Sequence, residues 1–96
     1  MKILAIEKDL PETPGRDMQP FLADEARTVW ALVQSEVIRE IAFTRKDRRA
    51  VLILECHDEA EAERVLGGLP LAHEGFIAFD VFGLRPYDGF ERLFGK

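Results

Sequence analysis

The chain has 96 residues, of which 47% are hydrophobic, and a formal net charge of −5. This length predicts a single domain, and the apolar content excludes a disordered chain. The negative charge argues against a nucleic-acid partner, and no apolar run reaches the roughly 20 residues of a membrane helix. The single cysteine, Cys56, excludes an intramolecular disulfide and fits a reducing compartment, so we expect a cytoplasmic protein.

The first part of the chain predicts a strand, a loop and a helix. Residues 2–8 ("KILAIEK") form an apolar run of strand length, and residues 9–17 contain two prolines and a glycine, which favour a loop. From residue 18 to residue 35 apolar side chains recur at helical spacing, and Asp17 is a suitable N-cap. The apolar positions are Leu22, Ala26, Val29, Trp30 and Val33.

The rest of the chain predicts two strands joined by a hairpin, then a helix and a last strand. The strands are expected over residues 37–45 and 50–56, with a polar turn between them. A helix begins at Asp58, which forms a capping box with Glu61, and ends at Gly67, Gly68 and Pro70. A fourth strand covers residues 75–84, and residues 85–96 form an aromatic tail.

This order predicts a ferredoxin-like α+β fold, βαββαβ, in which two helices cover one face of a four-stranded antiparallel sheet. The strands are apolar on both faces, although the helices cover only one. A second copy packed on the other face would make a dimeric α/β barrel, so we expect a homodimer or a higher homo-oligomer. The whole chain, residues 1–96, is one such domain, and the tail is expected to contact another subunit.

Four charged residues stand within or at the ends of the predicted strands: Arg39, Glu40, Glu55 and Asp80. Burying an unpaired charge costs several kcal/mol, so each needs a partner, water or a ligand. Alternation places Arg39 with Ile41 and Phe43, and Asp80 with Phe82, but does not show whether the two faces coincide.

Two interpretations of these charges stay open. An arginine–carboxylate pair can simply fix the register of the sheet or a subunit contact. Alternatively, Arg39 binds a substrate carboxylate, with Phe43 beside it, while Asp80, Glu55 or Glu40 moves a proton. Trp30 belongs to the core or lines a cavity under the helices, and His73, in a loop, reaches the mouth of a pocket.

The sequence contains no metal-ligand spacing, phosphate loop or dinucleotide fingerprint. We therefore expect no metal and no cofactor. Hydride transfer and phosphoryl transfer are disfavoured for the same reason.

Several short motifs, in order, resemble the muconolactone isomerase family of the dimeric α/β-barrel superfamily. They are "LP" at 10–11, "ADE" at 23–25, Arg39, Glu55, "LPL" at 69–71, Asp80-Val81 and "GL" at 83–84. The chain departs from the family's pattern at Ile38-Arg39-Glu40, where the family has Trp-Arg-His, and at residues 72–75, where the family has an apolar aromatic segment. The resemblance implies cofactor-independent movement of a double bond in a lactone that bears a carboxylate.

The leading hypothesis is therefore a proton-transfer isomerase that acts on a small lactone or organic acid. A non-catalytic ligand-binding or accessory protein is the alternative, because Glu40 stands where the family has a histidine. A cofactor-independent oxygenase of the same superfamily and a purely structural assembly protein are further alternatives.

Overall fold

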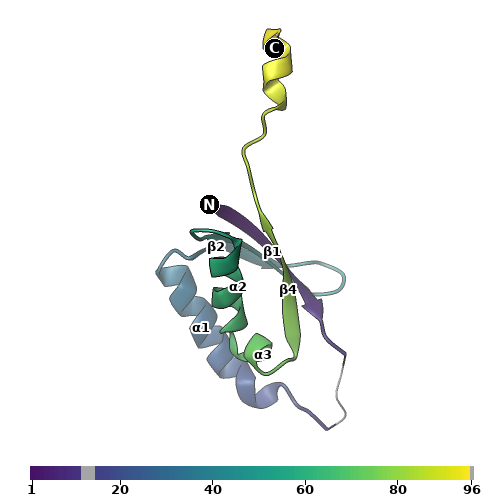
Figure 1. Ribbon diagram of the computed structural model, residues 1–96. Helices are drawn as coiled ribbons and strands as arrows, with labels where there is room; N and C mark the ends of the chain where they lie inside the picture. Colours follow the sequence, from purple (N-terminus) through teal and green to yellow (C-terminus); the bar gives the residue numbers. More distant parts are fainter. Residues whose placement is uncertain (12–14, 96) are drawn as a thin grey trace.

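The computed structural model describes residues 1–11 and 15–95, which form a four-stranded antiparallel sheet with helices on one face (Figure 1). The strands are β1 (Lys2–Asp9), β2 (Ile38–Phe43), β3 (Ala50–Glu55) and β4 (Ile77–Gly83). Their order in the sheet is β2-β3-β1-β4, so β2 and β4 are the edge strands. This topology confirms the predicted ferredoxin-like α+β fold.

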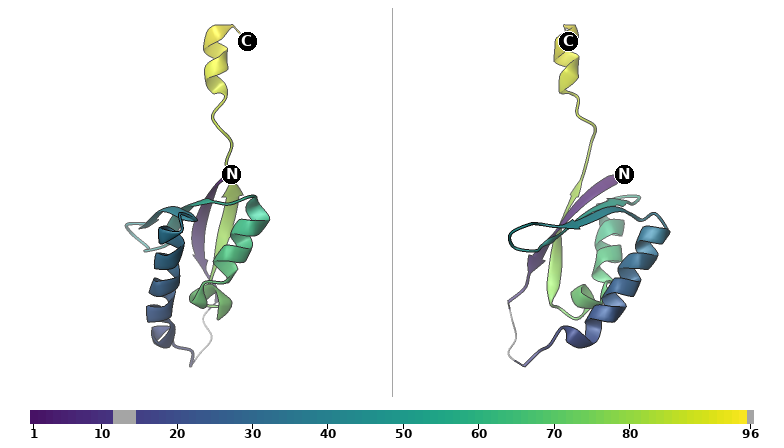
Figure 2. Two further views of the ribbon diagram at one scale, coloured as in Figure 1. Left: turned by 90° about the vertical axis from the view of Figure 1, so that its left-hand side faces the viewer. Right: turned by 180° about the vertical axis from the view of Figure 1, so that it is seen from behind.

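Two main helices, α1 (Leu22–Gln34) and α2 (Glu59–Gly67), lie on the same face of the sheet (Figure 2). The side chain of Asp58 accepts a hydrogen bond from the backbone N–H of Glu61 and caps α2, as predicted. Asp17 accepts a hydrogen bond from the N–H of Gln19, at the start of the short 3₁₀ helix η1 (Gln19–Phe21) that precedes α1. Residues 12–14 of the predicted loop lie outside the described residues.

The sequence did not predict the short helix α3 (Pro70–His73). Pro70 was expected to end the preceding helix, yet it occupies the first position of a new one. A proline is well suited to that position, because the N–H that it lacks would have no partner within the helix. A 3₁₀ helix, η2 (Gly89–Phe94), ends the described chain.

The core lies between the sheet and the helices. Ile3, Leu52 and Leu54 from the central strands are fully buried there, against Leu66 of α2. Ala62 of α2 and Leu69, which follows this helix, also belong to the core. None of the described helices is long and apolar enough to cross a membrane.

The opposite face of the sheet, which we call the outer face, carries no helix in the described part of the chain. The strand register places Leu4 opposite both Ile53 and Phe82, so all three side chains project on this face. Ile6, Val51, Ala42 and Ala78 extend the same surface. The prediction that both faces are apolar is therefore confirmed.

The predicted place of Trp30 was wrong. Its side chain is 61% exposed, whereas Val29, Leu32 and Val33 of the same helix pack against the core. The reason is that no residue of α1 is fully buried, so this helix presents only a narrow stripe to the sheet. A residue at the margin of the stripe, such as Trp30, stays in solvent despite its helical spacing.

Candidate functional site

Whether Arg39 and Asp80 share a pocket was left open by the sequence, and the two residues lie at opposite edges of the sheet. Asp80 is on the edge strand β4, opposite Ile6, and projects on the outer face. Its Oδ1 lies 3.0 Å from Nζ of Lys8, and both side chains are about half exposed. Arg39 is on the other edge strand, β2, so the fold of the chain does not bring Arg39 and Asp80 together.

A β-bulge explains why Arg39 and Glu40 stand side by side in an apolar strand. Ile38 pairs with Leu54 and Glu40 with Ile53, so Arg39 is the extra residue between them. Ile41 returns to the helix-covered face, opposite Leu52. The predicted alternation, which placed Arg39 on the face of Ile41, therefore fails at this point.

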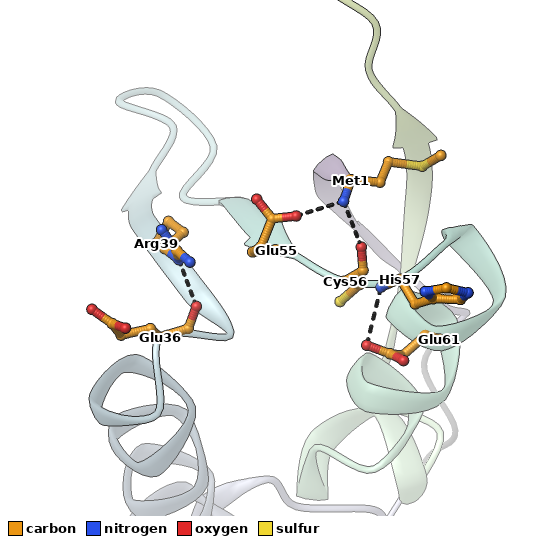
Figure 3. A network of polar contacts seen from close by, with 7 residues as sticks. All are labelled: Met1, Glu36, Arg39, Glu55, Cys56, His57 and Glu61. Atoms are coloured by element: carbon orange, nitrogen blue, oxygen red, sulfur yellow. Dashed lines mark hydrogen bonds and ion pairs between the residues drawn. The ribbon is translucent and has the colours of Figure 1, made fainter.

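The contacts of Arg39 are local (Figure 3). Its Nε donates a hydrogen bond of 2.7 Å to the carbonyl oxygen of Glu36. Its positive charge also contributes to lowering the pKa of Glu55. Arg39 thus binds the connection between α1 and β2 through a backbone carbonyl, which differs from the arginine–carboxylate pair of the structural interpretation.

Glu55 lies in an environment that favours its charged form. The largest influence is a hydrogen bond from the amino group of Met1, 2.5 Å from its Oε2, and this contact lowers the pKa of the Glu55 carboxyl. A carboxyl whose pKa is lowered is a weak general base near neutral pH.

The remaining predicted site residues are exposed and scattered. Glu40 lies on the outer face opposite Ile53, and Phe43 is 55% exposed beneath the guanidinium of Arg48. His73 ends α3 instead of lying in a loop, and its Nδ1 lies 3.3 Å from Glu74 Oε2. The structure brings none of these three side chains together with Asp80.

An acid that the sequence interpretation did not assign has the environment expected of a proton carrier. Glu25 lies on α1, is partly buried, and accepts a hydrogen bond of 2.9 Å from the backbone N–H of Leu71 at Oε1. Burial raises the pKa of the Glu25 carboxyl, and the nearby charge of Glu7 acts in the same direction. The bond from Leu71 opposes both effects but does not cancel them.

Glu7 belongs to the helix-covered face of β1, where it pairs with Phe79 of β4. Its Oε1 accepts a hydrogen bond of 2.8 Å from the N–H of Ala50, so its carboxylate is held in place. From this fixed position on the sheet, the charge of Glu7 acts on the partly buried Glu25 of α1.

Leu71 links Glu25 to a group made of one arginine and two aromatic rings. The N–H of Phe76 donates to the carbonyl oxygen of Leu71, whose own N–H binds Glu25. The guanidinium of Arg16 lies 4.3 Å from the centre of the Phe76 ring, and Phe21 packs against the same ring at 5.8 Å. We call Glu7, Glu25, Arg16, Phe21 and Phe76 the acid–arginine site.

A sequence signal for Glu25 existed. Glu25 stands in the "ADE" motif of the family resemblance, and it lies four residues before Val29 on the inner stripe of α1. A charged residue on the buried stripe of an amphipathic helix is an exception that needs a partner. The sequence interpretation considered only the charges in the predicted strands, and for that reason it did not assign Glu25.

The described residues contain no group of three metal-ligating side chains. Cys56 is buried, and its burial raises the pKa of the thiol, which disfavours a reactive thiolate. What the acid–arginine site offers is a proton-accepting carboxyl, a cation and apolar walls.

No protein-family model matches the sequence, and no curated protein matches it either. Solved structures with a similar fold exist. One is the crystal structure of muconolactone isomerase, with a TM-score of 0.75 and 16% sequence identity, covering 92% of each chain.

A second is 5-chloro-2-hydroxyhydroquinone dehydrochlorinase (TftG) from Burkholderia phenoliruptrix AC1100, in complex with 2,5-dihydroxybenzoquinone. Its TM-score is 0.60 at 21% identity, and the match covers 93% of this chain and 98% of that one. At these identities the likeness establishes the fold: the chain folds as muconolactone isomerase does.

Proposed function

We propose that this protein is a homo-oligomeric, cofactor-independent isomerase that moves a proton within a small lactone or organic acid at the acid–arginine site. The observation that carries the proposal is the partly buried Glu25 carboxyl with its raised pKa. A general base works best when its pKa is near the working pH, and burial moves Glu25 in that direction. The fold shared with muconolactone isomerase supports the same class of chemistry.

In the proposed reaction, Glu25 removes a proton from a carbon next to a carbonyl group, and the electron pair of that C–H bond moves into the conjugated system. The same carboxyl then returns the proton to another carbon, so that the double bond moves and no co-reactant is consumed. The N–H of Leu71 holds Oε1 of Glu25, which leaves Oε2 for the proton transfer.

Arg16 is suited to binding the carboxylate of the substrate. Its Nη1 binds the carbonyl oxygen of Glu74, and its Nη2 lies 3.6 Å from Oε1 of the same residue. A substrate carboxylate would therefore compete with Glu74 for the five N–H donors of the guanidinium. Arg39 remains a candidate for this task, although it lies at the other end of α1. From Glu25 to Gln34, the last residue of α1, the helix rises by roughly 14 Å, at about 1.5 Å per residue, and Arg39 binds Glu36 beyond that end.

Proton exchange tests the proposal without knowledge of the natural substrate. Muconolactone and a panel of small unsaturated lactones and carboxylic acids are incubated with the protein in D₂O, and the loss of C–H signals is followed by NMR. We expect exchange with the wild type and a fall of at least about 100-fold in Glu25→Gln, the scale typical of a lost general base.

Asp24→Asn is the matched control, because it removes a neighbouring exposed carboxylate from the same helix. Exchange at the wild-type rate in Glu25→Gln would contradict the role of Glu25. Binding of panel members without any exchange by the wild type would favour the non-catalytic ligand-binding alternative.

A further inference from the structure

The short helix α3 makes a contact with the acid–arginine site near each of its two ends. Near its start the N–H of Leu71 binds the carboxyl of Glu25, and just after its last residue the carbonyl oxygen of Glu74 accepts a hydrogen bond from Arg16. The chain then turns at Gly75, which takes the left-handed conformation with φ of 81°, as glycine commonly does after a helix. One four-residue helix therefore positions the partners of both the acid and the arginine.

The two contacts between Arg16 and Glu74 differ in quality. Nη1 of Arg16 donates a hydrogen bond of 2.5 Å to the carbonyl oxygen of Glu74, and carbonyl groups at a helix end lack partners within the helix. Nη2 lies 3.6 Å from Oε1 of the Glu74 carboxylate, which is too long for a hydrogen bond. The ring of Phe76, whose centre is 4.3 Å from the guanidinium carbon, also holds the arginine. The carbonyl and the ring thus position Arg16, whereas the carboxylate forms only a loose ion pair with it.

The Glu74 carboxylate has a second partner to which it can turn. Its Oε2 lies 3.3 Å from Nδ1 of His73, the last residue of α3. The side chains of Arg16 and Glu74 are 38% and 35% exposed, so a dissolved ligand reaches the pair, and an ion pair at such exposure is weak. A ligand carboxylate that binds the guanidinium through both oxygens, at about 2.8 Å, makes a stronger contact.

We propose that Glu74 is a specificity-determining residue that occupies the carboxylate site at Arg16 until the carboxylate of a ligand displaces it. Glu74 lowers the affinity for carboxylate ligands and leaves that for uncharged ligands unchanged, so weakly bound anions are kept away from the arginine. The inference rests on the proposed function for the role of Arg16 as the carboxylate-binding group. It also gives a role to residues 72–75, where the chain departs from the muconolactone isomerase pattern.

Binding of matched charged and uncharged ligands tests this competition. Muconolactone and benzoate, and the methyl ester of each, are titrated into the full chain, and the Nε–H resonance of Arg16 is followed by NMR. Glu74→Gln removes the charge but keeps the backbone carbonyl and the size of the side chain. We expect it to bind both carboxylates about two- to fivefold more tightly, the range set by a loose ion pair, and both esters as the wild type does.

Two further variants make the test specific to Arg16. Glu63→Gln removes an exposed carboxylate from α2 and should bind every ligand as the wild type does. Arg16→Gln should bind the carboxylates at least about tenfold more weakly, because it loses hydrogen bonds to a charged group. Adding Glu74→Gln to Arg16→Gln should give no gain, since the group for which Glu74 competes is then absent.

The inference is overturned if Glu74→Gln binds the carboxylates as the wild type does or more weakly, or if its gain persists without Arg16. Absence of carboxylate binding by both proteins at millimolar concentrations overturns it as well. Proton exchange is a separate readout, because Glu25→Gln should lose exchange and still bind carboxylates. Competition without exchange would contradict the proposed reaction alone, and exchange without competition would contradict this inference alone.

Discussion

Glu25 illustrates how one residue can link folding stability to chemistry. Its carboxyl is partly buried between α1 and the sheet, close to Glu7, and both features favour the protonated form. A site that raises the pKa of an acid is less stable when that acid is charged. The same environment that suits Glu25 for proton transfer therefore destabilises the fold near neutral pH.

The pH dependence of folding should reveal this cost. The folded-state pKa of Glu25 lies above its unfolded value, so its contribution to stability is fully present below the unfolded pKa and is lost as pH rises through the folded one. Glu25→Gln keeps a neutral side chain that can still accept the Leu71 hydrogen bond. We expect the variant to be more stable than the wild type at pH 7 and equally stable at pH 4.

Urea denaturation of both proteins from pH 4 to pH 8 measures this difference, and Asp24→Asn reports the effect of removing an exposed carboxylate. A Glu25→Gln variant that is less stable than the wild type at pH 7 would contradict the assignment of the buried charge.

Among the elements, the connection from α1 to β2 shows how a helix end sets up the first part of an edge strand. The N–H of Glu36 binds the carbonyl oxygen of Val33, and the N–H of Val37 binds that of Leu32. This is a Schellman motif, in which the residue after the helix takes the left-handed conformation. That residue is Glu36, with φ of 65°, where glycine is usual.

Glu36→Gly should therefore stabilise the protein by about 0.5–1 kcal/mol. Glycine adopts the left-handed conformation without the strain of a Cβ atom, and this gain exceeds the added freedom of the unfolded chain. Glu36→Ala is the matched control, because alanine removes the same carboxylate but keeps the Cβ. Chemical denaturation should show stabilisation for glycine alone, and equal effects of both substitutions would contradict the explanation.

The sequence predicted the elements well where periodicity is regular. The four strands and two main helices appear close to their expected places, because alternation and helical spacing report directly on burial. Prediction failed where one residue breaks the pattern. The bulge at Arg39 reverses the alternation, Pro70 begins a helix instead of ending one, and Trp30 lies at the margin of a narrow contact stripe.

The candidate site could not be assembled from the sequence for a related reason. Its residues come from β1, the segment before η1, η1 itself, α1 and the position just before β4. Their proximity depends on how α1 and α3 sit on the sheet. Spacing along the chain does not carry that information, whereas the topology of the sheet did follow from the order of elements.

At the scale of the whole molecule, the outer face raises the question of assembly. Its apolar side chains lie on all four strands, and a monomer would leave them in water. Two sheets that pack face to face bury such surfaces between them, in a core about 10 Å thick. We therefore propose the outer face as the main contact of the homo-oligomer.

A charge placed on this face should separate the subunits. Ala42 lies on the outer face of the edge strand β2 and is exposed in one subunit, so Ala42→Glu should leave the subunit folded. Burying the new charge in an interface costs several kcal/mol, which raises the dissociation constant by about 100-fold or more. Sedimentation velocity over a range of micromolar concentrations measures the change.

Ala60→Glu on the exposed side of α2 is the control and should assemble as the wild type does. A wild-type protein that sediments as a monomer throughout this range would contradict the proposed contact. So would a dimer that Ala42→Glu leaves intact.

The two edge strands, β2 and β4, differ in how strongly they discourage pairing with strands of other molecules. β2 has a bulge and two adjacent charges, a combination that discourages a foreign strand from adding to it. β4 pairs without a bulge and carries one charge, Asp80. The unpaired backbone N–H and C=O groups along its outer edge can therefore pair with strands of other molecules and start aggregation. Because β4 is an edge strand, a protein that does not assemble should precipitate through pairing at this edge during heating or storage, even when each molecule still folds correctly.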